Sequence, residues 1–79
     1  MPTKEEIHEE NRRIRRLRML TDITISLILQ GNLTCEQASD LVAGVRATAL
    51  KLFPGKENVF DLVLAPRFRR VMCEKYGFH

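Results

Sequence analysis

The chain of 79 residues contains little cysteine, glycine and proline, and each of these shortages excludes a class of protein. It has two cysteines, four glycines, three prolines and no tryptophan. Cys35 and Cys73 are too few for a disulfide scaffold, which needs several bridges. The low glycine and proline content, with 44% hydrophobic residues, excludes collagen-like, low-complexity and intrinsically disordered classes. We therefore expect one folded domain in which both thiols are reduced.

Long apolar segments are also missing. The longest apolar-rich run extends from Ile23 to Leu29, far short of the roughly 20 residues that cross a bilayer. The first ten residues, MPTKEEIHEE, lack the apolar core of a secretory signal. These absences favour a cytoplasmic protein without a membrane partner.

Patterns that carry catalysis or bind cofactors are absent as well. There is no glycine-rich phosphate loop, and Ser26, Ser39 and Thr48 have no histidine or aspartate at triad-like spacing. The soft metal ligands are scattered, without the paired spacing of a zinc site: Cys35, Cys73, His8 and His79. We expect no cofactor, no metal ion and no enzymatic activity.

Turn-forming residues divide the chain into helical pieces. Gly31-Asn32, Pro54-Gly55, Pro66 and Gly77 separate segments with helical periodicity. They predict a single all-α domain over residues 1–79, with helices at about 4–30, 35–53, 58–65 and 66–76. The short link after Gly31 makes the long first helix and the second helix an antiparallel hairpin. Pro66 either kinks the C-terminal part or begins a separate helix there, and this part packs back on the hairpin.

Capping signals set the ends of the first two helices. Thr3 with Glu6, and Thr34 with Gln37, each have the spacing of a capping box. Gly31 fits the left-handed position that often follows a helix. These signals predict a helix start after Thr3, an end at Gly31 and a second start after Thr34.

The first helix has one narrow apolar seam along its whole length. At about 100° per residue, seven side chains lie within about 100° of one another: Ile7, Ile14, Leu17, Thr21, Thr24, Ile25 and Ile28. A second stripe of Leu20, Ile23 and Leu27 appears only in the C-terminal half. We therefore expect that half to be buried on both sides.

The N-terminal half of this seam points to self-association. It has too few apolar residues to form a core, and their spacing is too regular for a segment that extends freely into solvent. In an isolated compact chain of this size, the burial of apolar surface stabilises the folded state by about 125 kcal/mol. The conformational entropy lost when the chain becomes ordered opposes folding by about 120 kcal/mol. This near-zero balance favours a homodimer, with another helical protein as the alternative partner. The expected self-association residues are Ile7, Ile14, Leu17 and Thr21.

Two arginine clusters support a competing interpretation. Five arginines lie between positions 12 and 18, and three follow Pro66. They could bind a nucleic-acid phosphate backbone, but four glutamates precede the first cluster and are typical of a solvated or coiled-coil face. We favour a small intracellular helical interaction or structural module, with a basic nucleic-acid-binding protein as the alternative. The residues for that alternative are Arg12, Arg13, Arg16, Arg67, Arg69 and Arg70.

Overall fold

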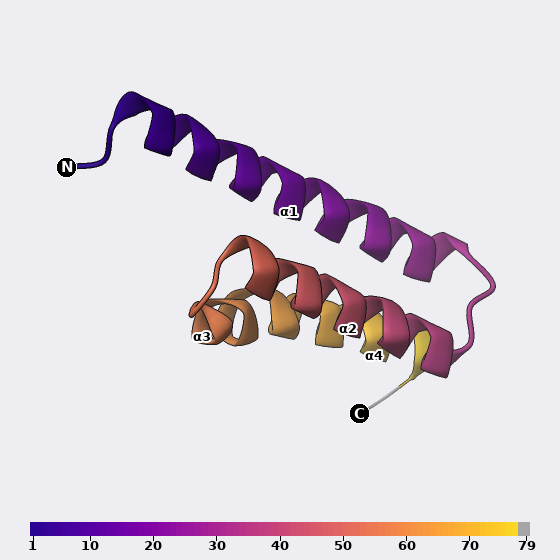
Figure 1. Cartoon of the computed structure of the whole chain (residues 1–79). Coiled ribbons are helices and arrows are strands. Elements are labelled where there is room, and N and C mark those ends of the chain that lie inside the picture. Colours follow the sequence, from indigo (N-terminus) through magenta and orange to yellow (C-terminus); the bar gives the residue numbers. More distant parts are fainter. Residues whose placement is uncertain (78–79) are drawn as a thin grey trace.

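The computed structural model describes residues 1–77 and contains three helical rods (Figure 1). The first rod is α1 (Lys4–Gln30) and the second is α2 (Cys35–Leu52). The third consists of α3 (Glu57–Val59), η1 (Phe60–Leu64) and α4 (Ala65–Tyr76), which follow one another without a break. No strand occurs in the described part of the chain. The predicted all-α class, the α1–α2 hairpin and the returning C-terminal helix are confirmed.

The start of α2 is fixed by the predicted capping box. The Gln37 N–H donates to Thr34 Oγ1 at 3.1 Å, and the Thr34 N–H donates to Gln37 Oε1 at 3.0 Å. Two backbone donors that a helix start leaves unpaired are thereby satisfied. At the start of α1 the Glu6 N–H donates to Thr3 Oγ1 at 3.1 Å. Both predicted helix starts are confirmed.

Gly31 ends α1, but not in the left-handed conformation that we expected. Its φ of −88° and ψ of 166° are those of extended backbone. Its N–H donates to the Leu27 carbonyl oxygen at 2.9 Å, and a Cβ at this position would lie 2.6 Å from that same oxygen. Glycine is required by this close approach. A left-handed glycine does occur at the end of α4, where Gly77 has a φ of 71°.

A π-helical turn joins the two parts of the third rod. In η1 the Ala65 N–H donates to the Phe60 carbonyl oxygen, five residues earlier. Pro66 follows directly, in the first turn of α4. Proline has no N–H, and its ring would collide with the carbonyl four residues earlier in a regular α-helix. The wider turn accommodates Pro66, so the C-terminal part forms one continuous helix with a bulge.

The core lies between the three rods and forms two adjoining clusters. Phe60 and Phe68, with ring centroids 6.5 Å apart, pack with Val45 and Ala49 between α2 and the third rod. A second cluster lies nearer the α1–α2 link and contains Ile28, Ala38 and Val71. This arrangement buries the C-terminal half of the α1 seam.

The second stripe of α1 is not buried, contrary to our expectation. Leu20 packs against the first core cluster, but Ile23 and Leu27 are 52% and 50% exposed. The reason is that α2 and α4 both contact α1 from the side of the seam that holds Thr21, Thr24 and Ile28. No element of residues 1–77 covers the opposite side.

The molecule is elongated and exposes more surface than a compact monomer. It measures 46 × 22 × 16 Å and has a radius of gyration of 14.1 Å, against about 11.6 Å for a compact domain of this length. Its accessible surface is 6151 Å², against about 4,900 Å² for a monomer of this mass. The N-terminal turns of α1 extend beyond the other two rods (Figure 1) and contribute to this excess.

Candidate interaction groove

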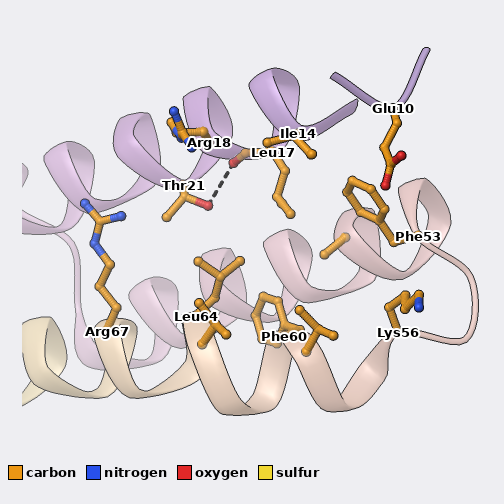
Figure 2. Close-up of a pocket in the computed structure, with 13 residues that line it drawn as sticks. Glu10, Ile14, Leu17, Arg18, Thr21, Phe53, Lys56, Phe60, Leu64 and Arg67 are labelled. Carbon is orange, nitrogen blue, oxygen red and sulfur yellow. Dashed lines mark hydrogen bonds between the residues drawn. The ribbon is translucent and has the colours of Figure 1, made fainter. Parts of the chain in front are cut away.

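An apolar groove of about 490 Å³ lies between the N-terminal half of α1 and the beginning of the third rod. Figure 2 shows Leu17 pointing from α1 toward Leu64 and Phe60, with Phe53 beneath Glu10 at one end and Arg67 at the other. The α1 wall bears Ile14, Leu17 and Thr21. The opposite wall comes from α2, the turn after it, α3 and η1, with the following apolar residues: Ala49, Phe53, Val59, Phe60, Val63 and Leu64.

The rim of the groove is mainly basic. Arg18, Lys56 and Arg67 line it, with Glu10 as the one carboxylate among its lining residues. Arg67 also bonds Asp22 of α1 through Nη2 to Oδ1 at 3.3 Å. That ion pair links α4 to α1 at one end of the groove. Both partners are more than half exposed, so the pair orients the two helices more than it stabilises them.

The structure places three of the four predicted self-association residues in this groove and the fourth beyond it. Thr21 is only 1% exposed, and its hydroxyl donates to the Leu17 carbonyl oxygen at 2.8 Å. Leu17 packs against the first core cluster. Ile14 and Ile7 remain 41% and 44% exposed. Within one chain, therefore, Thr21 and Leu17 form the floor of the groove, and Ile14 and Ile7 offer the free apolar surface.

Sequence reasoning missed the opposite wall of the groove. Val59 and Val63 are 55% and 63% exposed although both are large and apolar. The signal was present in the run from Val59 to Leu64, where five of six residues are apolar. A short helix that buries one face cannot bury all of them. An excess of this kind indicates a second apolar surface beside the core.

The structure brings one arginine of each cluster together, because Arg18 and Arg67 both line the groove. Arg12, Arg13 and Arg16 are exposed and centre about 150° around α1 from Ile14, given about 100° per residue. Arg13 is engaged by Glu9 at 3.5 Å. On α4, Arg67 lies at the groove, and Arg69 is turned about 160° from it. Arg70 is exposed as well.

The cysteines show neither a bridge nor a metal arrangement. Cys35 and Cys73 are both free and partly buried, and residues 1–77 contain no group of three potential metal ligands. His8 is exposed on the first turns of α1. His79 lies outside the described residues.

Comparison with known proteins gives no relative for this chain. No protein-family model matches it, and neither the curated proteins nor the solved structures contain a significant match. In the described part of the chain, no helix has both the length and the hydropathy needed to cross a membrane. The candidate function therefore rests on the groove and its charges.

Proposed function

We propose that this chain is a self-associating helical interaction module, and that the groove with the adjoining N-terminal half of α1 forms its interface. The central observation is an apolar surface that is continuous over two elements and uncovered in the single chain. Ile14 contributes to it from α1, and Val59 and Val63 from the third rod, while Ile7 is exposed nearer the start of α1 on the same seam. Apolar surface of this extent marks a protein contact more often than a solvated face.

The surface area supports a dimer. The chain exposes 6151 Å², about 1,200 Å² more than a compact monomer of its mass. A stable interface typically buries about 800 Å² on each partner. The excess is therefore large enough to supply one interface of standard size.

Substitution of Ile14 by aspartate tests this proposal. Ile14 is 41% exposed and lies in the groove wall, and Met19 on the other side of α1 is 58% exposed. Ile14→Asp would place an unpaired charge in the interface, at a cost of a few kcal/mol. We expect light scattering to show the wild type and Met19→Asp as dimers, and Ile14→Asp as a folded monomer.

Two results would count against the proposed interface. A dimeric Ile14→Asp variant would show that the two copies contact one another elsewhere. An equal loss of association in Ile14→Asp and Met19→Asp would show that the groove contributes no more to the contact than the other side of α1. Circular dichroism separates loss of association from loss of folding. Leu17→Asp serves as the contrasting variant: because Leu17 packs on the core, we expect that variant to unfold at every concentration.

A further inference from the structure

The charges along α1 indicate how two copies meet. Glu10, Ile14 and Arg18 are spaced four residues apart, so they form one stripe on the helix, and all three line the groove. Neither Glu10 nor Arg18 forms an ion pair with another residue of the described chain. An unpaired carboxylate and an unpaired guanidinium thus flank an exposed isoleucine on the same face.

The two ends of this stripe have opposite charge. The first ten residues contain four glutamates and one lysine. The groove rim contains Arg18, Lys56 and Arg67. Glu10, the glutamate among these that lines the groove, is therefore complementary in charge to the basic rim of the groove in a second copy. Charge complementarity of this kind fixes the orientation of partners more than it adds affinity.

On the basis of the self-association proposed above, we propose that the two α1 helices of a dimer pack antiparallel, with the two-fold axis beside Ile14. Residues 10 and 18 are equally distant from position 14, so Glu10 of each copy lies opposite the partner's Arg18. Ile14 meets its own symmetry mate. Ile7 reaches the partner's groove near the level of Thr21, where Leu64 forms the other wall.

A parallel arrangement conflicts with the same charges. It would place Glu10 beside Glu10 and Arg18 beside Arg18, and like charges at close range oppose association. A symmetric dimer uses the same surface on both copies, so the charge pattern must complement itself. Only the antiparallel orientation satisfies this condition with these two residues.

Charge reversal tests the arrangement. Glu10→Arg alone turns both intersubunit pairs into Arg–Arg, and Arg18→Glu alone turns both into Glu–Glu. We expect each variant to dimerise about tenfold more weakly than the wild type. In an equimolar mixture both pairs become Arg–Glu, so native mass spectrometry should show the mixed dimer as the dominant species. The double variant Glu10→Arg/Arg18→Glu should regain wild-type association.

Glu9→Arg and Arg16→Glu are the matched controls. They make the same charge changes on α1 but on the side away from the groove, about 140° and 160° from Ile14. We expect each to dimerise like the wild type, and a mixture of the two to pair at random. Single variants Glu10→Arg and Arg18→Glu that each dimerise as tightly as the wild type would overturn the antiparallel arrangement alone, because a parallel dimer has two like-charged pairs in the wild type and in both variants. A wild type that stays monomeric would refute the proposed function itself.

Discussion

At the scale of single residues, buried threonines occupy the α1 seam beside aliphatic side chains. Thr21 and Thr24 are 1% and 4% exposed. Each hydroxyl donates to the carbonyl oxygen one turn earlier, at 2.8 and 2.7 Å, and so presents mainly its methyl group to the core. Helical periodicity placed both residues on the apolar seam, but Thr21, which we expected at the self-association surface, is buried within the single chain. A threonine with this local hydrogen bond can replace an aliphatic residue on an apolar face.

The chemistry of glycine shows where single-residue prediction fails. Gly31 was correctly identified as the end of α1, but for the wrong conformation. A positive φ depends on local sequence, whereas the close approach to the Leu27 carbonyl oxygen depends on the path of the link into α2. The sequence therefore predicted that α1 ends at Gly31, and the structure explains why a glycine is needed at that position.

We predict opposite effects on stability for alanine at two glycines. In Gly31→Ala the new Cβ would lie 2.6 Å from a backbone oxygen, whereas nothing lies within 4 Å of a Cβ at Gly44 in α2. Gly31→Ala should lower the free energy of unfolding by about 1–3 kcal/mol. Gly44→Ala should raise it by about 0.5–1 kcal/mol, because alanine favours a helix interior. Urea denaturation at one fixed protein concentration measures both, and equal effects would contradict the assigned contacts.

At the scale of elements, the sequence predicted the rods better than their joints. Capping residues and the 3.6-residue period located α1 and α2 to within one residue at each end. Of the two alternatives expected for the C-terminal part, one kinked helix or two short helices at about 58–65 and 66–76, the structure shows one rod with the π turn of η1. The turn arises because Pro66 must be accommodated while Phe60 and Phe68 both remain in the core. This requirement depends on tertiary packing, so the local sequence did not predict the turn.

The capping box of α2 offers a prediction at this scale. Thr34→Ala removes the hydroxyl that accepts the Gln37 N–H, and we expect a loss of about 1 kcal/mol in the free energy of unfolding. Thr34→Ser keeps the acceptor and should stay within a few tenths of a kcal/mol of the wild type. Denaturation midpoints of the two variants, measured side by side, test this. Equal midpoints would show that the cap does not stabilise the hairpin.

At the scale of the whole molecule, the sequence predicted one wall of the candidate site. Ile14, Leu17 and Thr21 were identified from the seam of α1 and do line the groove. The other wall could not be found, because it depends on how the third rod returns beside α1. The division of the seam into a buried C-terminal half and an exposed N-terminal half was expected from the sequence, and the structure bears it out with Thr21, Thr24 and Ile28 buried and Ile7 and Ile14 exposed.

Nucleic-acid binding through the arginines makes a separate prediction. Arg12, Arg13 and Arg16 form an exposed patch away from the groove, so self-association would leave them free. Because glutamates lie one to two turns earlier on α1, we expect only weak binding to duplex DNA or RNA, lost near physiological salt. Replacing all three by glutamine should reduce the salt slope by about one unit per lost phosphate contact.

A contrary result in that titration would change the preferred function. Tight binding at physiological salt that disappears in the triple glutamine variant would favour the nucleic-acid interpretation over the interaction module. Binding that persists in the triple variant would point instead to the α4 arginines, of which Arg67 is already engaged by Asp22. Fluorescence anisotropy over a series of salt concentrations distinguishes these outcomes.

The mass of the wild-type protein in solution tests the central claim most directly. Sedimentation equilibrium at micromolar to high micromolar concentrations reports whether the 9.2 kDa chain associates, without labels or substitutions. The exposed groove and the excess surface predict a reversible increase from one chain mass to two as concentration rises. A single chain mass over the whole range would contradict the account, because the apolar surface of Ile7, Ile14, Val59 and Val63 would then be stable in water without a second copy.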